Sequence, residues 1–166
     1  SAGECTDAEP GYYATTGSTE QTPCSPGTVA PNASMGSCRK CDAGTYQDAP
    51  QQTACRVCSV GAYCAEGASA ALPCAAGRYS SAAGLGSPDA CITCPLGSAC
   101  GTGAHQPAVC NPGMYSNATG ASTCELCESG TYQPDYNSAA CRVCVSLPAA
   151  LRASQSVSLR TKAFPK

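Results

Sequence analysis

Four cysteines in the first half of the chain have a spacing that is known from metal and redox sites. They follow the pattern Cys38-x2-Cys41-x13-Cys55-x2-Cys58. Two Cys-x2-Cys pairs at this distance are typical of structural zinc sites, where four thiolates surround the ion. One such pair is also the redox motif of thioredoxin-like proteins, in which a lowered thiol pKa serves disulfide exchange. The rest of the chain must decide between these chemistries and structural disulfides.

The remaining cysteines argue against a metal or redox site. The chain has 166 residues and 16 cysteines, and from Cys24 the gaps between successive cysteines are 13, 2, 13, 2, 5, 9, 16, 2, 5, 9, 13, 2, 13 and 2 residues, ending at Cys144. Gaps of five and nine residues do not continue a four-ligand pattern, and no βαβ pattern surrounds the Cys-x2-Cys pairs. Self-similarity of this kind predicts tandem repeats that are held together by disulfides.

The repeated unit opens with a cysteine, and a glycine follows three residues later. Most units then have a tyrosine two residues after the glycine, as in the stretch Cys41–Cys58, CDAGTYQDAPQQTACRVC. Because glycine adopts positive φ angles readily, the pattern predicts a tight turn followed by a short strand whose tyrosine packs on a disulfide. Almost no helix is expected before residue 145. Strands are predicted within Gly44–Gln47, Arg78–Ser80, Met114–Ser116 and Thr131–Gln133.

The spacing divides the chain into a repeat region and two flanking segments. Residues 1–23 contain one cysteine, Cys5, and predict a partial or degenerate module. Residues 145–166 contain no cysteine, glycine or tyrosine and carry four basic and no acidic side chains. We expect packing on an acidic neighbour, such as another copy, to order this tail. The repeat region 24–144 is predicted to contain the units 24–40, 41–57, 58–93, 94–126 and 127–144.

Composition explains why the fold needs disulfides. The chain has a single Phe and no Trp, and its hydrophobic fraction of 43% consists mostly of Ala and Cys. At about 25 cal/mol per Å² of buried apolar surface, such side chains cannot offset the entropy lost on folding. A disulfide typically contributes about 2–4 kcal/mol by restricting the unfolded chain. We therefore predict a small disulfide-rich fold, an elongated rod of tandem cysteine-rich modules with short β-hairpins.

Two disulfide schemes are compatible with the periodicity. In both, short units close on themselves and Cys5 and Cys144 stay unpaired at opposite ends, free to bond to flanking sequence or to another copy. The favoured scheme, in which long units cross, is Cys24–Cys38, Cys41–Cys55, Cys58–Cys74, Cys64–Cys91, Cys94–Cys110, Cys100–Cys124 and Cys127–Cys141. The rival scheme closes neighbouring cysteines in turn, with Cys58–Cys64 and Cys74–Cys91.

Disulfides indicate an oxidising compartment, so we expect an extracellular or cell-surface protein of the secretory pathway. Two N-glycosylation sequons agree, Asn32-Ala33-Ser34 and Asn117-Ala118-Thr119. The net charge of −2 gives no reason to expect nucleic acid. No transmembrane run is present.

Nothing in the residue pattern predicts catalysis. The single histidine, His105, lies in a polar loop where solvation is expected. Glu125 and Glu128 flank Cys127, but acid–base chemistry needs a cleft that shifts a pKa, and this composition does not favour one. We expect neither an enzyme nor a bound cofactor or metal.

The segments Cys41–Cys58 and Cys127–Cys144, with Cys-x2-Gly-Thr-Tyr-Gln followed by Cys-x2-Cys, resemble the ephrin-receptor-like cysteine-rich repeat. They are also similar to the cysteine-rich modules of growth-factor and tumour-necrosis-factor receptors. The stretch Cys58–Cys91 looks like variants in large surface proteins of protists and algae. The resemblance covers residues 24–144 and implies the pairings of the short units. These modules serve as stalks, spacers and ligand platforms alike.

We therefore expect a non-enzymatic subunit of an extracellular surface coat or filament, which is glycosylated and self-associates head to tail. The alternative is a ligand-binding receptor ectodomain or adhesion module, which would need exposed aromatic or arginine anchors. The candidates for such anchors are Tyr12, Tyr136, Arg56, Arg78 and Arg142.

Overall fold

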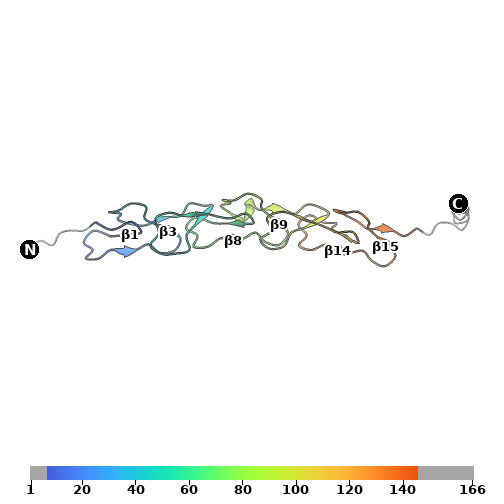
Figure 1. Ribbon diagram of the computed structural model, residues 1–166, viewed down its shortest axis with the longest axis horizontal. Helices are drawn as coiled ribbons and strands as arrows, with labels where there is room; N and C mark the ends of the chain where they lie inside the picture. Colours follow the sequence, from blue (N-terminus) through green and yellow to red (C-terminus); the bar gives the residue numbers. More distant parts are fainter. Residues whose placement is uncertain (1–6, 146–166) are drawn as a thin grey trace, which may run out of the picture.

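The computed structural model describes residues 7–145, which form an elongated rod (Figure 1). The rod consists of eight two-stranded antiparallel hairpins that follow one another along its length. The only helical segment in the described part is the single 3-10 turn η1, Pro88–Ala90. The predicted fold, a disulfide-rich rod of short hairpins with almost no helix, is confirmed. Cys5 and residues 146–166, on which the predictions for the tail rest, lie outside the described residues.

Every strand is two residues long, and each hairpin pairs two strands that are consecutive in the chain. The four predicted strand segments contain β5, β9, β13 and β15. The strands are β1 Tyr12–Tyr13, β2 Thr22–Pro23, β3 Thr28–Val29, β4 Arg39–Lys40, β5 Thr45–Tyr46, β6 Arg56–Val57, β7 Ala62–Tyr63, β8 Leu72–Pro73, β9 Arg78–Tyr79, β10 Ile92–Thr93, β11 Ser98–Ala99, β12 Ala108–Val109, β13 Met114–Tyr115, β14 Glu125–Leu126, β15 Thr131–Tyr132 and β16 Arg142–Val143.

One hairpin with the turn before it makes one structural unit. The expected long segments 58–93 and 94–126 each contain two hairpins, so the chain has more units than the cysteine spacing indicated. In chain order, units 1 to 8 are 8–23, 24–40, 41–57, 58–73, 74–93, 94–109, 110–126 and 127–143.

A tight turn begins each unit and depends on its glycine. In unit 3, the amide of Thr45 donates to the carbonyl of Asp42 (3.0 Å), and Gly44 between them has φ +89°. This is the arrangement in which the third turn residue must have a positive φ, which glycine adopts without strain. The Thr45 hydroxyl donates to the same carbonyl (2.7 Å). The turn aims the following strand back past the opening cysteine.

Backbone hydrogen bonds join each unit to the next. Between units 3 and 4, the turn glycine Gly44 donates its N–H to the carbonyl of Cys64 (2.8 Å). The seventh residue of unit 3, Gln47, donates to Ala68 (3.1 Å), and Gly67 donates back to Cys41 (2.7 Å). These three bonds recur at every junction from unit 1 to unit 8. We call them the ladder. The ladder fixes how the units follow one another along the rod.

Each unit also touches the unit two steps further along. The carbonyl of Gly84 in unit 5 lies directly over Gly44 of unit 3, where a side chain would collide with it. Gly84 has φ +76° and holds the place that we call the loop residue, because it lies in the loop between the two strands. The loop residues of units 1 to 8 all have positive φ; they are Gly17, Ser34, Gln51, Gly67, Gly84, Gly103, Gly120 and Asn137.

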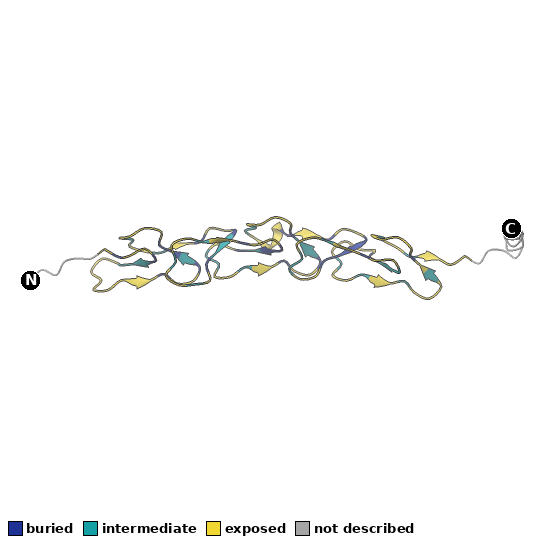
Figure 2. Ribbon diagram, viewed as in Figure 1, coloured by how far each residue is buried: buried dark blue, intermediate teal, exposed yellow. Residues whose placement is uncertain are grey.

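The interior is a narrow column of cysteines and small residues rather than a hydrophobic core. Buried residues follow the axis of the rod, and both residues of the second strand of every hairpin are exposed (Figure 2). The seventh residue of each unit belongs to this column and is buried in units 2 to 8. These residues are Ala30, Gln47, Cys64, Ser80, Cys100, Ser116 and Gln133.

Buried polar side chains in the column bond to their own unit. Gln47 is only 2% exposed, and its Nε2 donates to the carbonyl of Ala54 (2.7 Å). Gln133 makes the same bond to Ala140 (2.6 Å), and Ser80 donates to Ala82 (2.9 Å). A buried polar group costs stability unless it is hydrogen-bonded, so these bonds permit amides and hydroxyls in the column. In these units the loop is thereby tied to the residue that follows the first strand.

Three glycine variants separate the two ways in which a side chain would destabilise the fold, collision with a neighbouring carbonyl and strain at a positive φ angle. Gly77→Ala is expected to lower the melting temperature most, because Gly77 has φ +82° and its new methyl group would meet the carbonyl of Gly120. At Gly130 (φ +85°) no described atom lies within 4 Å, so Gly130→Ala is expected to cost only the positive-φ penalty of about 1–2 kcal/mol. Gly101→Ala, with neither feature, is the control. Thermal unfolding of the oxidised proteins measures the order, and equal losses at Gly77 and Gly130 would contradict contact between second neighbours.

Candidate functional site

The candidate site is the column of disulfides, which is the only place where reactive side chains gather along the described rod. Seven disulfides form between residues 24 and 141. The three pairs within the short units 2, 3 and 8 are those that the repeat pattern favours. They are Cys24–Cys38, Cys41–Cys55 and Cys127–Cys141.

The crossed pairs of the favoured scheme are wrong. In their place, the structure has the pairing of the rival scheme, which closes neighbouring cysteines in turn. The overturned pairs are Cys58–Cys74, Cys64–Cys91, Cys94–Cys110 and Cys100–Cys124. The observed pairs are Cys58–Cys64, Cys74–Cys91, Cys94–Cys100 and Cys110–Cys124.

The reason for the correction is the turn after each opening cysteine. The turn at Gly61 folds the first strand of unit 4 back, so that the seventh residue, Cys64, has its Cα 6.1 Å from that of Cys58. This lies within the range that a disulfide bridges. Cys74 opens the next hairpin instead, where its amide donates to the carbonyl of Gly61 (2.8 Å). The same geometry in unit 6 joins Cys94 to Cys100 across 5.9 Å.

The apparent zinc motif is thereby divided among three units. Cys38 bonds to Cys24 in unit 2, Cys41 bonds to Cys55 in unit 3, and Cys58 bonds to Cys64 in unit 4. A Cys-x2-Cys pair consists of the closing cysteine of one unit and the opening cysteine of the next, and these two cysteines belong to different disulfides. Cys144, which follows this rule as the opening residue of a next unit, is the only free cysteine among the described residues and is exposed.

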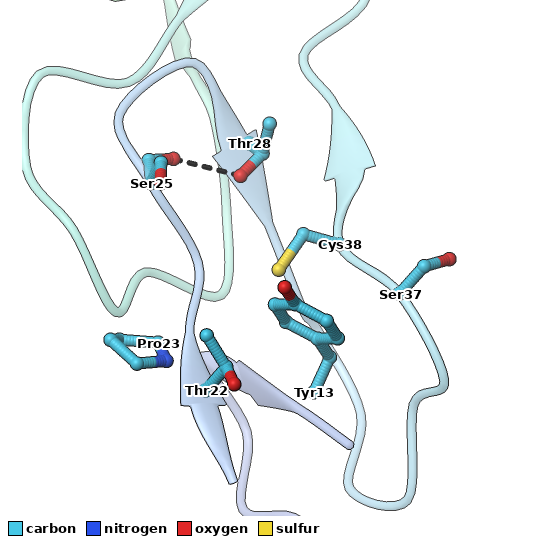
Figure 3. Close-up of a pocket in the computed structure, with 7 residues that line it drawn as sticks. All are labelled: Tyr13, Thr22, Pro23, Ser25, Thr28, Ser37 and Cys38. Carbon is cyan, nitrogen blue, oxygen red and sulfur yellow. Dashed lines mark hydrogen bonds between the residues drawn. The ribbon is translucent and has the colours of Figure 1, made fainter. Parts of the chain in front are cut away.

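Tyrosines of the first strands pack beside disulfides of the following unit. Tyr13 of unit 1 points its ring toward Cys38 of unit 2 (Figure 3). These two residues and Thr28 line an open hollow of about 320 Å³. At the other end, Tyr115 and Cys141 line a similar hollow of about 290 Å³ between units 7 and 8. At these two junctions a tyrosine lies beside a disulfide cysteine of the next unit, which agrees with the predicted packing of the tyrosines on disulfides.

A neighbouring carboxylate raises the pKa of one of these tyrosines, Tyr115. The hydrogen bond between the side chains of Tyr115 and Glu125, opposite residues on β13 and β14, raises the pKa of Tyr115, and the negative charge of Glu125 adds to the effect. Glu128, on the rim of the same hollow, raises it slightly further. The phenol thus remains a neutral hydrogen-bond donor. This arrangement suits packing and does not activate Tyr115 as a base.

The arginines that could anchor a ligand are engaged within the chain. Arg56 pairs with Asp48 (3.2 Å) on the surface of unit 3, and Arg142 pairs with Asp135 in unit 8. Arg78 donates to the carbonyl of Cys91 (2.8 Å). Exposed ion pairs of this kind contribute little to stability, about 0–1 kcal/mol. These contacts nevertheless engage the guanidinium groups that a ligand-binding surface would need to present.

The other predicted site residues lie on the surface. Both sequon asparagines, Asn32 and Asn117, are exposed, and each lies in the loop between the two strands of its unit. His105 is exposed in the loop of unit 6. Tyr136 is exposed in unit 8, and Tyr12 is half-buried. The structure brings none of these side chains together.

The segment 1–23, predicted as a partial or degenerate module, contains a complete unit, 8–23, that has no disulfide. Ala8 takes the place of the opening cysteine, is buried, and its carbonyl accepts from Ser34 (2.8 Å), as Cys24 accepts from Gln51 in the next unit. Gln21 accepts from the amide of Glu9 (2.8 Å), so a side-chain hydrogen bond closes this unit instead of a disulfide. Gly11, three residues after Ala8, was the signal that could have revealed it.

Comparison with known families agrees with the geometry. Residues 113–158 match the family described as tyrosine-protein kinase ephrin type A/B receptor-like. This segment is an ephrin-receptor-like cysteine-rich module. No curated protein matches the chain significantly. The matched segment contains the hairpins of units 7 and 8, and the other units share their turn, hairpin and ladder bonds.

The disulfides and the ephrin-receptor-like module together indicate an extracellular or cell-surface protein. Among residues 7–145, no helix has the length and hydrophobicity required to cross a bilayer.

Removal of single disulfides tests the pairing. The double variant Cys58→Ala/Cys64→Ser gives unit 4 the residue types found without a disulfide elsewhere in the column, and we expect it to fold with a loss of about 2 kcal/mol, because the closed loop is short. Cys74→Ala/Cys91→Ser removes the longer link and is expected to cost about 3 kcal/mol. Urea titration of both proteins gives the comparison. The mixed variant Cys58→Ala/Cys74→Ser is the control: it leaves Cys64 and Cys91 with free thiols, whereas the crossed scheme would leave them bonded to each other.

Proposed function

We propose that the chain is a non-enzymatic structural rod, a subunit of an extracellular surface coat or filament that self-associates and carries N-linked glycans. The ladder is the observation that supports this function. It links each unit to its neighbours by the same backbone bonds regardless of side chain, and contacts with second neighbours add a further constraint. Such an arrangement resists bending at any single junction. A protein built in this way holds a fixed length between its two ends.

The surface supports a structural function better than catalysis. The hollows are shallow and open, and those at the unit junctions are lined mainly by Thr, Ser, Pro and Ala beside a tyrosine. His105 and the acidic residues of the described chain do not converge in a cleft, where pKa values could be shifted for acid–base work. We therefore propose that the protein acts through its shape and its contacts.

Glycans fit the proposed setting. The side chains of Asn32 and Asn117 are exposed and neither residue makes a ladder bond, so a sugar attached there leaves the ladder bonds intact. We expect one glycan at each site when the chain passes through a secretory pathway. Asn32→Gln and Asn117→Gln should each remove one glycan, measured as a mobility shift that N-glycosidase treatment reproduces on the unmodified chain. Asn111→Gln is the control, because Asn111 is followed by Pro112 and has Gly113 where a sequon requires Ser or Thr; a shift with this variant would contradict the assignment.

Self-association is tested on the oxidised, secreted chain. We expect light scattering coupled to gel filtration to show masses that rise with protein concentration, and electron microscopy to show strings of rods. Free Cys144 is available for a bond to Cys5 of another copy, so part of the strings should survive denaturation without reductant. Cys144→Ser should remove only this covalent fraction. Monomers alone at high concentration would refute the proposed function and favour the alternative, a ligand-binding ectodomain.

A further inference from the structure

The last two units of the rod are incompletely covered. The turn glycine is buried in units 1 to 6, half-buried in unit 7 and exposed in unit 8. The cause is that each turn glycine is covered by the ladder of the next unit and by the loop carbonyl of the unit after it. Accordingly, Gly97 lies under the carbonyl of Asn137, whereas no described atom lies within 4 Å of a Cβ built at Gly113 or Gly130. Among residues 7–145, unit 8 thus lacks the contacts that a following unit makes at every earlier junction.

Three backbone groups of unit 8 have no hydrogen-bond partner among residues 7–145. They are the N–H of Gly130, the N–H of Gln133 and the carbonyl of Cys127. The equivalent groups of unit 7 are all bonded, because Gly113 donates to Gln133 (2.7 Å) and Ser116 donates to Ser138 (3.0 Å). Asn137 donates to Cys110 (3.0 Å) in the same way. Unit 8 therefore presents two donors and one acceptor in the geometry that the ladder uses.

Apolar side chains surround these groups. Leu126 and Val143 are the last residues of their hairpins and are 73% and 68% exposed. Tyr132 is 47% exposed, whereas the tyrosines in the first strands of the earlier units are half-buried. The residue equivalent to Leu126 in unit 3 is Val57, which lies against the loop residue Gly84 two units further along. Terminal units of repeat proteins normally have a polar outer face. This end has the composition of a covered surface.

The start of unit 1 presents the complementary groups. The carbonyls of Ala14 and Ser18 and the N–H of Gly17 have no backbone partner among the described residues. In every later unit the equivalent groups are bonded to the unit before. Burial agrees: the seventh residue is buried in units 2 to 8 but only half-buried at Ala14, and Ser18 is exposed where Met35, its equivalent in unit 2, is half-buried. Unit 1 can therefore accept two ladder bonds and donate one.

Charge also favours contact between the two ends. Residues 1–38 contain four acidic and no basic side chains, whereas residues 145–166 contain four basic and no acidic ones; unit 8 itself carries Glu128 and Asp135 beside Arg142. Opposite charges steer association and suppress the wrong orientation. Within one rod the two ends lie far apart (Figure 1). A second copy of the chain offers each end a partner of complementary charge.

We propose that unit 1 of one copy docks on unit 8 of another and continues the ladder without a break, a proposal that rests on the self-association proposed above. Gly130 N–H donates to the Ala14 carbonyl, Gln133 N–H donates to the Ser18 carbonyl, and Gly17 N–H donates to the Cys127 carbonyl. The loop residue Gly17 then covers Gly113 and lies against Leu126. Ser34, the loop residue of unit 2, covers Gly130 in the same way. The joint is an ordinary junction of the rod, made between two chains.

The joint is tested with variants that block one end each, in a Cys144→Ser background that removes the thiol. Leu126→Glu/Val143→Glu places negative charges at the unit 8 end, which would face the acidic unit 1. Ser18→Arg/Glu20→Arg reverses the charge of the unit 1 end and so removes its complementarity to the basic segment 145–166. All four positions are exposed, so the variants should fold. Each variant alone is expected to raise the concentration for half-maximal assembly by about tenfold or more, because the charges of the two ends are no longer complementary.

Mixing the two variants gives the decisive result. Each variant keeps one intact end, and the two changed ends carry opposite charges, so an equimolar mixture is expected to recover the assembly that neither variant shows alone, measured by light scattering and native mass spectrometry. Leu72→Glu and Thr53→Arg each add one charge of the corresponding sign at an exposed position in the middle of the rod and should assemble like the parent chain.

The outcomes that overturn the joint differ from those that overturn self-association. Strings that form equally well from both end variants would show another contact, and the joint would be refuted while self-association stood. If the parent chain were monomeric and deletion of residues 146–166 made it assemble, the chain's own tail would be the cover of unit 8. A parent chain and a deletion variant that both stay monomeric would refute the proposed function and the joint together.

Discussion

Backbone hydrogen bonds between successive units are the constraint on which the rest of the structure depends. Each turn glycine donates toward the following unit, and the seventh residue both accepts that bond and donates onward, as Cys64 does between Gly44 and Leu85. Because these bonds use only main-chain groups, side chains matter chiefly where space is short. That restriction falls on the turn glycine, which has no room for a methyl group beneath the loop carbonyl two units away. A chain with little apolar surface can therefore form a regular rod.

Disulfides complement the ladder because they lock each unit internally while the ladder joins units to each other. The opening cysteine reaches either the seventh residue, as in Cys58–Cys64, or the residue before the second strand, as in Cys41–Cys55. When the second choice is used, the seventh position is free for a small or polar side chain such as Gln47, which ties the same loop by a hydrogen bond. Unit 1 shows that the ladder tolerates the loss of the disulfide altogether, with Ala8 in the opening position.

The sequence predicted those features that repeat at fixed distances from an opening cysteine. The turn at Gly44, the strand that follows it and the pairing of Cys41 with Cys55 could all be read from one unit. The pairing in the segments with gaps of five and nine residues could not, because it depends on whether Cys74 closes one hairpin or opens another, and only the hairpin register decides that. Unit 1 could be predicted only as a partial or degenerate module, because its opening residue is Ala8 and not a cysteine. The glycine three residues later, Gly11, is the signal in the sequence that identifies it as a unit.

A ladder of this kind has a direction, and the direction determines how copies can associate. The turn glycines of units 1 to 7 all donate toward higher residue numbers, so among residues 7–145 one end of the rod carries unpaired donors where the other carries acceptors, and the two ends differ. Association through identical surfaces, which gives closed dimers, would set donors of unit 8 against donors. A contact between unlike ends does not close on itself in a straight rod and so generates an open string. The charge difference between the two ends of the sequence also favours contact between unlike ends. The physical basis of the rod, main-chain bonds that all run one way, thus also favours its extension beyond a single chain.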